Sequence, residues 1–461
     1  MSKPFSWSLF RSDVVGTARL ARIAGSGVTA MIVMFLCTAS LAGAQEPGQA
    51  GGAQPARAAP APPAITTAYA GDIATRSTLT GDWGGGRTWL EDHGITLKPR
   101  FTQFYEGLAS GAGEGDHSAE YGNKLDVTLN ADLDTLGLWK GLSMTVHAEY
   151  NAGAHVNLQG GTLMPINTAM MFPGIKGPDA FDVTNVAFKQ TFSNRASLTL
   201  GKISIVDYCD KKPFHGGVGI DAFWNIVFVA PPSGTVPVAF LGAILSIPTK
   251  AATYGVWLYD PNSSLNKSAL DHPFADGFTL RGSVSFPVTM GGLTGHQGLA
   301  VSYSNKPGTD LDTLDGIPVP PSPSTPKKDQ RYYFAYTIDQ FLYQSKANPR
   351  EGVGLFGQFE VSDGNPNPLK WMAFGGIGGT GLIRRRSRDN WGIGYYYAAP
   401  SKYLQDMPAP YPGIFHEQAL EVFYNLALTP WLVLGADLQI LSPSAANETA
   451  VFPGLRLVIR L

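Results

Sequence analysis

The chain has little cysteine, little charge and no long apolar run beyond its first residues. It has two cysteines among 461 residues, and charged residues make up 15%, whereas soluble domains typically carry about 25%. No run of eighteen apolar residues follows residues 23–41, which excludes a helical membrane protein. The formal net charge of −2 provides no basic surplus for binding nucleic acid.

Sequence motifs of catalysis are also missing. The chain has no Gly-x-Ser-x-Gly elbow and no His-Glu-x-x-His motif, and His215 and His272 stand alone without the spacing of metal ligands. Residues 310–316 (DLDTLDG) resemble a calcium-binding loop only loosely, because the glutamate that would complete such a loop is absent. We therefore expect no enzyme activity, no cofactor and no metal.

The first residues predict export from the cytoplasm. Three arginines precede an almost wholly apolar or small stretch at residues 23–41, and small residues follow from Ala42 to Ala44. This order is typical of a secretory signal peptide. We expect cleavage after residues 1–44, with a transmembrane anchor as the alternative. Only Cys209 then remains, so the exported chain has no internal disulfide.

Two short segments separate the signal from the rest of the chain. Residues 45–75 are built mainly from Ala, Pro, Gly and Gln, and we expect a flexible periplasmic leader because they cannot bury enough apolar surface to fold. Within residues 76–94, the stretch from Arg87 to His93 predicts a short periplasmic helix that ends at Gly94.

Residues 95–461 follow a period of two. In the last seven residues, Leu455, Leu457, Ile459 and Leu461 alternate with Arg456, Val458 and Arg460. Successive side chains of a strand point to opposite faces, so one face is apolar and the other carries two guanidinium groups. Similar segments recur along the chain and are about as long as the ~9–11 residues of a transmembrane strand. The pattern predicts a closed barrel with lipid outside and water inside.

The connections between these segments differ in length. Counting the segments gives roughly 14 to 18 strands, and we predict sixteen, because an even number returns both ends to the periplasm and sixteen strands enclose an aqueous channel. The fold class is thus all-β: a transmembrane antiparallel β-barrel of about 16 strands in the outer membrane, with a short N-terminal helix. The proline-rich residues 316–329 predict an external loop, with a linker between two domains as the alternative. Long connections, which tend to be functional, are expected at 152–182, 206–237, 305–330 and 399–415.

Polar side chains in the inward phase of the strands predict a hydrated lumen. A sugar must exchange hydrogen bonds with water for hydrogen bonds with the protein, and it also packs on aromatic rings. Each residue alone is explained more simply by ion pairs of the wall than by a sugar contact, and Trp224 is a candidate for stacking on a sugar from a long loop. The predicted channel lining consists of Lys98, Arg100, Glu106, Asp126, Asn130, Asp132, His147, Glu149, Trp224, Arg281, Glu360, Glu421, Asp437, Gln439, Arg456 and Arg460.

Several separate segments resemble the carbohydrate-selective porins of the OprB type. They are LTGDWGGGRTWLEDHGI (79–95), FDVTNVAFKQTFSNRASLTLGK (181–202) and ALTPWLVLGADLQILSPS (427–444), followed by the closing PGLRLVIRL. The resemblance implies a sixteen-stranded porin that passes monosaccharides by diffusion, with a pore that inward loops narrow and charged and aromatic side chains line. Leu461 departs from the pattern, because outer-membrane chains usually end in an aromatic residue used for assembly.

We therefore expect selective passive diffusion of carbohydrates, glucose foremost, through a charged and aromatic-lined constriction. The expected partners are glucose-like monosaccharides, outer-membrane lipid and the barrel assembly machinery, with a monomer favoured over a trimer. Two alternatives remain open: an outer-membrane barrel enzyme that acts on lipids, and a secreted all-β protein that binds sugars.

Overall fold

The structure, a computed structural model, describes most of the chain from Tyr69 to Leu461. The signal peptide expected over residues 1–44 lies outside the described residues, as does the expected leader up to residue 68. The described residues are 69–111, 117–157, 159–173, 179–193, 195–209, 212–316, 325–346, 348–349, 351–381, 383, 386–407, 413–446 and 448–461.

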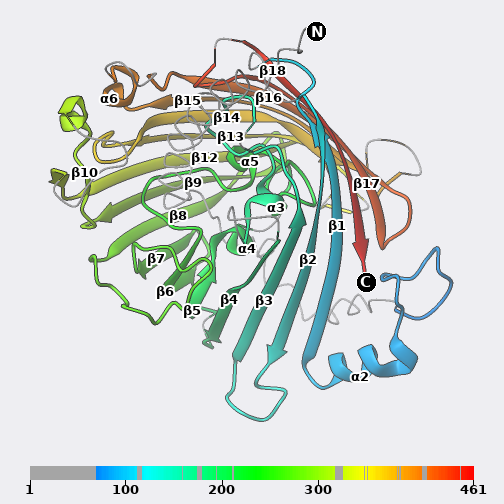
Figure 1. Cartoon of the computed structure of the whole chain (residues 1–461). Coiled ribbons are helices and arrows are strands. Elements are labelled where there is room, and N and C mark those ends of the chain that lie inside the picture. The colour runs from blue at the N-terminus through cyan, green and yellow to red at the C-terminus, as the bar shows by residue number, and fades with distance from the viewer. Residues whose placement is uncertain are drawn as a thin grey trace, which may run out of the picture.

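Sixteen strands form one closed antiparallel barrel (Figure 1), which confirms the predicted strand number and fold class. Each strand pairs with the barrel strands before and after it, and β1 pairs with β18 to close the ring. The barrel strands are β1 (Ile95–Gly107), β2 (Ala119–Asp132), β3 (Leu142–Gly153), β4 (Asp179–Thr191), β5 (Ser197–Ser204), β6 (Ala239–Pro248), β7 (Thr253–Tyr259), β8 (Thr279–Met290), β9 (Leu293–Ser304), β12 (Arg331–Gln344), β13 (Gly352–Ser362), β14 (Leu369–Thr380), β15 (Asn390–Pro400), β16 (Glu417–Ala427), β17 (Leu432–Ser442) and β18 (Ala450–Arg460). A separate two-stranded sheet pairs β10 (Gly308–Thr309) with β11 (Lys327–Lys328) in the connection from β9 to β12.

The helices are short. They are η1 (Trp83–Gly85), α2 (Gly86–Asp92), α3 (Thr168–Met171), α4 (Ile205–Tyr208), α5 (Ile226–Val229), η2 (Leu311–Gly316) and α6 (Lys402–Gln405). Among the described residues, no helix has the length and apolar character needed to cross a membrane. The helix predicted from Arg87 to His93 is present as α2, shifted by one residue, and Gly94 follows it with a φ of +81°, a conformation that ends helices.

The two faces of the strands differ as the period of two predicts. On β18, Leu455 is 51% exposed on the outer face, whereas Arg456 is 0% exposed on the inner face. Large apolar side chains are exposed on strands all around the barrel, which suits a wall in lipid and argues against a soluble secreted protein. Examples are Tyr105, Tyr121, Leu200, Val256, Leu280, Val301, Tyr332, Leu355, Ile393, Leu420, Leu438 and Leu455.

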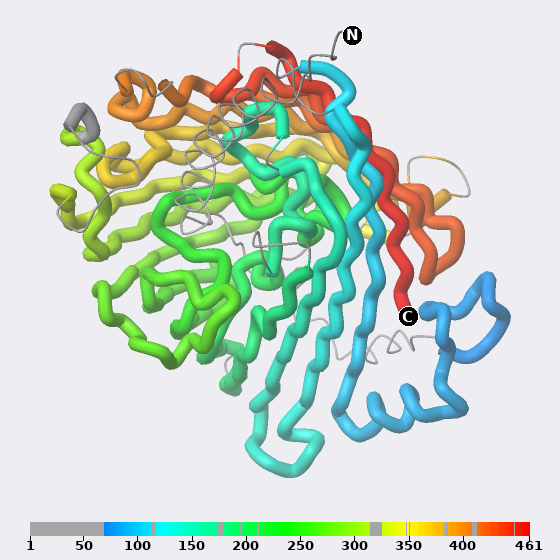
Figure 2. The backbone as a smooth tube through the Cα atoms, viewed as in Figure 1, coloured from blue at the N-terminus to red at the C-terminus, as the bar shows by residue number. Residues whose placement is uncertain are grey.

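Long connections and short turns lie at opposite ends of the barrel. Because successive strands run in opposite directions, every second connection falls at the same end, as the chain trace in Figure 2 shows. One end carries the connections at 108–118, 154–178, 205–238, 260–278, 305–330, 363–368, 401–416 and 443–449. The other end carries short turns, such as 192–196 and 291–292, together with α2. In outer-membrane barrels the longer connections face the outside of the cell.

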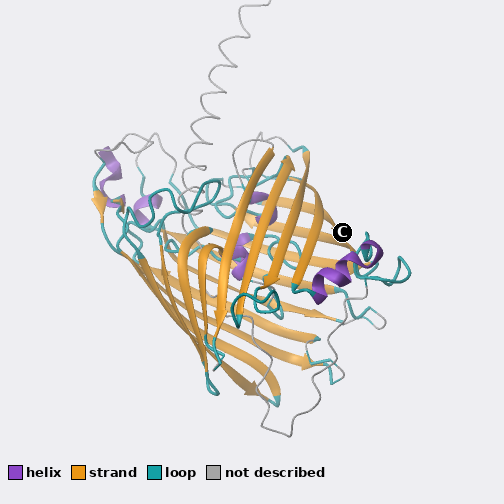
Figure 3. Cartoon of the chain, turned by 90° about the horizontal axis from the view of Figure 1, so that it is seen from below, coloured by secondary structure: helices purple, strands orange, loops and turns teal. Residues whose placement is uncertain are grey.

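Two of the long connections enter the barrel. The β3–β4 connection carries α3, and the β5–β6 connection carries α4 and α5, and these helices lie within the ring of strands in Figures 1 and 3, whereas α2 lies outside it. Phe223 and Phe228 of the β5–β6 connection are fully buried and pack against Phe356 and Phe423 of the wall. The wall approaches closely here, because a Cβ on Gly394 would lie 2.7 Å from the Phe228 ring. These segments narrow the interior from one side.

Candidate functional site

A carboxylate of the wall holds the β5–β6 connection by its backbone. Glu421 of β16 accepts hydrogen bonds from the backbone N–H groups of Trp224, at 2.6 Å, and Asn225, at 3.1 Å. Glu421 is 0% exposed, so these donors offset part of the cost of burying its carboxylate. The predicted lining residue Glu421 therefore anchors an inward segment.

The β3–β4 connection is held in the same way by a glutamate four residues earlier on β16. Glu417 of β16 accepts hydrogen bonds from the backbone N–H groups of Leu163 and Met164, the latter at 2.8 Å, and from the Tyr396 hydroxyl at 2.9 Å. Side chains in the same phase of one strand share a face. One strand thus holds both inward connections.

Arg456 of β18 holds the β5–β6 connection by its carbonyl groups. Its guanidinium donates hydrogen bonds to the carbonyl oxygens of Gly219, at 2.9 Å, and Ala222, at 3.0 Å, and to Oδ1 of Asn425 at 2.9 Å. The fork of a guanidinium group suits several acceptors at once. The predicted lining residue Arg456 is therefore occupied by the chain's own groups.

Trp224, the residue predicted to stack on a sugar, lies under this guanidinium. The Arg456 Cζ atom is 4.8 Å from the Trp224 ring centroid, and the ring meets Phe104 of β1 edge to face at 5.4 Å. The side chain is 1% exposed, and a Cβ on Gly454 would come within 2.8 Å of its ring. In this arrangement Trp224 packs the inward connection against the wall.

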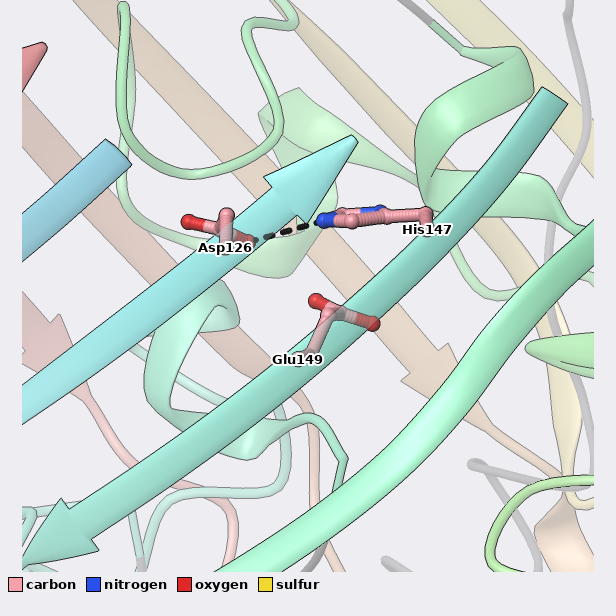
Figure 4. A group of neighbouring side chains, drawn as sticks. All are labelled: Asp126, His147 and Glu149. Atoms are coloured by element: carbon pink, nitrogen blue, oxygen red, sulfur yellow. Dashed lines mark hydrogen bonds and ion pairs between the residues drawn. The ribbon is translucent and has the colours of Figure 1, made fainter. Parts of the chain in front are cut away.

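A group of charged side chains joins β1, β2 and β3 to the β5–β6 connection. Asp126 forms an ion pair with Arg100 at 3.3 Å. It also contacts His147 Nε2 at 3.1 Å, the contact drawn in Figure 4. Lys124 forms ion pairs with Glu149 and, at 3.8 Å, with Asp126. We call these residues the charged cluster: Arg100, Lys124, Asp126, His147 and Glu149 of the wall, with Asp207 and Asp221 of the connection.

Two aspartates of the connection complete the charged cluster. Asp207 of α4 contacts His147 Nδ1 at 2.8 Å. Asp221 forms ion pairs with Arg100 at 3.1 Å and with Arg460 at 3.0 Å. These ion pairs tie the β5–β6 connection to the wall strands β1, β3 and β18.

The donors of the charged cluster include a triad with metal-ligand chemistry. Asp126, His147 and Glu149 each offer one ligand atom, and these three atoms lie within 4.8 Å of one another. The ammonium group of Lys124 contacts both carboxylates, and the guanidinium of Arg100 contacts one of them. Because cationic side chains already neutralise these carboxylates, the donor set fits an ion-pair network better than a metal site.

The residues of α4 line two pockets. The first, the cluster pocket, is lined by the charged cluster's wall residues and by Val206 and Asp207. The second contains Tyr208, the next residue of α4, together with Trp257 of β7 and Arg281 of β8. We call this second one the Arg281 pocket, and it is lined by Tyr208, Thr253, Gly255, Trp257, Arg281, Ser283, Val284, Ser285, Gly298, Leu299, Ala300, Ala335 and Thr337.

The predicted lining residues do not all reach the narrowed interior. Lys98 and Asp132 are exposed, and Asp132 accepts a hydrogen bond from the Thr135 hydroxyl at 2.8 Å in the turn after β2. Arg100, Asn130 and Arg460 are partly buried. The fully buried ones are Glu106, Asp126, His147, Glu149, Trp224, Arg281, Glu360, Glu421, Asp437, Gln439 and Arg456.

Several of these buried groups bond one another or the inward connections. Glu106 accepts from the Asn167 side chain at 2.9 Å, and Glu360 accepts from the Tyr333 hydroxyl at 2.7 Å. Gln439 donates to Asp437 at 3.0 Å and to a backbone carbonyl of the β3–β4 connection at 2.8 Å.

The residues that sequence reasoning missed lie mainly in the β5–β6 connection. Asp207, Tyr208 and Asp221 follow no strand period, so no local pattern marks them as facing the lumen. Trp257 does carry a signal, because it lies between Val256 and Leu258, which are 46% and 45% exposed on the outer wall, and its phase places it inside.

The fold and this interior define a porin: a β-barrel with an apolar outer wall, a charged interior and long connections that narrow that interior. The carbohydrate-selective porin family, OprB, matches residues 116–461. The chain belongs to this family, which indicates a channel for sugars in the outer membrane rather than an enzyme.

Solved structures agree on the fold. The high-pH structure of Pseudomonas putida OprB is similar, with 18% identity, a TM-score of 0.73, and coverage of 85% of this chain and 100% of that chain. The low-pH structure of the same protein has 15% identity, a TM-score of 0.53, and coverage of 84% and 99%. A search of curated proteins found no match.

Proposed function

We propose that this porin lets monosaccharides such as glucose diffuse passively past a constriction at α4. The observation that carries the proposal is that the inward helix α4 borders both pockets, with Val206 and Asp207 in the cluster pocket and Tyr208 in the Arg281 pocket. One pocket offers charged donors and acceptors, and the other offers hydroxyl groups beside aromatic rings. Sugars use both kinds of contact, and weak contacts at several positions permit passage without tight holding.

The predicted lining residues act in this proposal in two ways. Glu421, Arg456 and Gln439 fix the inward connections and so set the width of the channel. The exposed and partly buried members, together with the charged cluster, provide hydrogen bonds to the solute. A signal peptide removed after residue 44, insertion by the barrel assembly machinery and a monomeric channel complete the proposal.

A planar-bilayer recording tests the proposal. Glucose that enters the constriction displaces ions, so its addition is expected to lower the single-channel current in a concentration-dependent way. A trisaccharide, which is too large to pass, is the matched control and is expected to change the current only as far as it changes the bulk conductivity. An equal effect of both sugars would contradict a constriction selective for monosaccharides.

A further inference from the structure

The Arg281 pocket contains a buried cation that the chain itself does not satisfy. Arg281 is 1% exposed, and its Nε and Nη2 atoms have no hydrogen-bond partner among the described residues. Its only hydrogen bond to a side chain there is a long one, 3.5 Å from Nη1 to the Ser302 hydroxyl. None of the ion pairs formed within the described parts of the chain includes Arg281. The buried Glu360 side chain is close enough to interact electrostatically with Arg281, but the two form no ion pair. The Nε and Nη2 atoms of Arg281 therefore remain available to donate to an acceptor.

Three arginines of the narrowed interior differ from Arg281, whereas Arg331 of β12 resembles it. Arg331 is buried, its Nε has no hydrogen-bond partner among the described residues, and its Nη1 donates to the carbonyl oxygen of Gly234 at 3.3 Å. Arg100 and Arg460 are paired with aspartates, and Arg456 donates to three oxygens of the protein. Arg331 lines neither the cluster pocket nor the Arg281 pocket, so of the two only Arg281 borders one of these pockets.

The geometry of the pocket limits what can bind there. The Arg281 Cζ atom lies 5.2 Å from the Trp257 ring centroid, and the Tyr208 ring meets Trp257 edge to face at 4.9 Å. The cavity has a volume of about 20 Å³, room for a group about the size of one or two water molecules. It therefore admits the charged end of a solute, while the remainder of that solute stays in the lumen.

The rest of the lining suits a solute rich in hydroxyl groups. Ser283 and Ser285 share the inward phase of β8 with Arg281, and Thr253 and Thr337 face them from β7 and β12. Hydroxyl groups both donate and accept hydrogen bonds, so they match the hydroxyl groups of a sugar. Two planar N–H groups of a guanidinium match the two oxygens of a carboxylate.

We propose that the Arg281 pocket binds the carboxylate of a sugar acid, such as an aldonic acid, on its way through the channel. The Nε and Nη2 atoms of Arg281 hold the two carboxylate oxygens, and serine and threonine hydroxyls of the lining hydrogen-bond with hydroxyl groups of the part of the solute that stays in the lumen. This inference extends the proposed sugar channel and rests on it, because the solute reaches the pocket through the lumen.

The test uses the full-length protein in planar bilayers with three probes. Gluconate carries the carboxylate and the hydroxyl groups, glucose carries hydroxyl groups alone, and acetate carries the carboxylate alone. In the wild type we expect gluconate to block the ion current at a concentration about tenfold lower than either control probe. Arg281→Gln is expected to abolish this difference while glucose still lowers the current, and Arg281→Lys is expected to keep part of it. Arg195→Gln, which removes a guanidinium from an exposed turn, is the control for net charge and is expected to behave as the wild type.

Each outcome has a distinct meaning. Equal block by gluconate and glucose in the wild type, or by gluconate and acetate, would overturn the sugar-acid site, and this comparison remains decisive even if Arg281→Gln fails to fold. A gluconate block that persists in a folded Arg281→Gln channel would overturn the assignment to Arg281. If none of the probes alters the current, the proposed sugar channel itself fails, which is a different result from a channel that accepts glucose without preferring gluconate.

Discussion

Single residues of the wall hold the backbone of the inward connections rather than line empty space. Glu421 illustrates this, because its buried carboxylate receives two backbone N–H groups from the β5–β6 connection. The pair of donors comes from residues that no strand pattern marks. The strand pattern therefore predicts that Glu421 faces the lumen, but the backbone groups that it binds determine its role.

Glu421→Ala should loosen this connection. The two N–H groups would lose their acceptor, at a cost of about 1–3 kcal/mol each while they stay buried, so we expect a larger and noisier single-channel conductance and easier unfolding. Leu420→Ala, on the outer face of the same strand, is the control and should leave the conductance unchanged. An unaltered, quiet conductance in Glu421→Ala would show that the bond to the connection does not set the width.

Lys306, in the connection after β9, gives a prediction for pH dependence. Burial, aided by the positive charge of Arg331, lowers the pKa of Lys306 to about 8, below its unfolded value of about 10.4. The folded state therefore disfavours the charged form, and this penalty is relieved as the pH rises from about 8 to 10. The wild type should gain more heat stability between pH 7.5 and 9.5 than Lys306→Met, as measured by the temperature at which its mobility on SDS gels changes. The same gain in both proteins would contradict a lowered pKa.

At the scale of elements, the barrel wall is shaped to receive the inward connections. Gly394 of β15 and Gly454 of β18 leave room for the rings of Phe228 and Trp224. Glycine in a strand often marks such a close approach of another segment. The wall and the connections therefore fit each other as one packed unit.

Gly394→Ala should push α5 away from the wall. The new methyl group would lie 2.7 Å from the Phe228 ring, and overpacking of this kind typically costs about 1–3 kcal/mol. We expect a changed single-channel conductance and a lower unfolding temperature. Gly282→Ala is the matched control, because its methyl group would meet only Val301, at 3.7 Å. Identical behaviour of the two variants would contradict tight packing at Gly394.

The segment before β1 binds the end of β18, where the barrel closes. Arg87 of α2 donates a hydrogen bond to the carbonyl oxygen of Leu461 at 2.6 Å, and its guanidinium lies 4.1 Å from the Trp83 ring centroid. The backbone N–H of Leu79 also donates to the carbonyl oxygen of Arg460 at 2.8 Å. Leu79 and Arg87 therefore hold the end of β18 in place by hydrogen bonds, and we call this pair of contacts the clamp.

Arg87→Gln should weaken this clamp by about 1–3 kcal/mol, because a hydrogen bond and a cation–π contact are both lost. The temperature of the mobility change on SDS gels is expected to fall by a few degrees. Arg87→Lys should restore only part of the loss, because lysine lacks the planar fork, and Lys140→Gln, in an exposed turn at the same end, should have no effect. A variant Arg87→Gln as resistant as the wild type would refute the clamp.

For the whole molecule, the sequence predicts the wall far better than the interior. The alternation of Leu455, Arg456 and Leu457 reports directly on lipid and lumen, because each strand residue faces one or the other. The strands and the inward phase of Arg281, Glu421 and Arg456 follow from that rule, whereas the short helix before them is predicted by a separate signal, the glycine that ends it.

The path through the lumen could not be predicted in the same way. Which connection enters the barrel depends on long-range contacts, such as those of Glu421 with the backbone at Trp224, and these leave no periodic trace. Trp224 was expected to face a sugar and instead packs under Arg456, while Asp207 and Tyr208, which border the two pockets, have no local signal.

The central claim is that the barrel has an apolar outer wall and a hydrated lumen that admits small sugars. Swelling of proteoliposomes tests this claim most directly. Vesicles that contain the purified protein should swell several-fold faster in isotonic glucose than in an isotonic trisaccharide, and protein-free vesicles should not swell in either. Negligible swelling in both sugars with folded protein present would contradict the channel, and equally fast swelling in both would contradict its constriction.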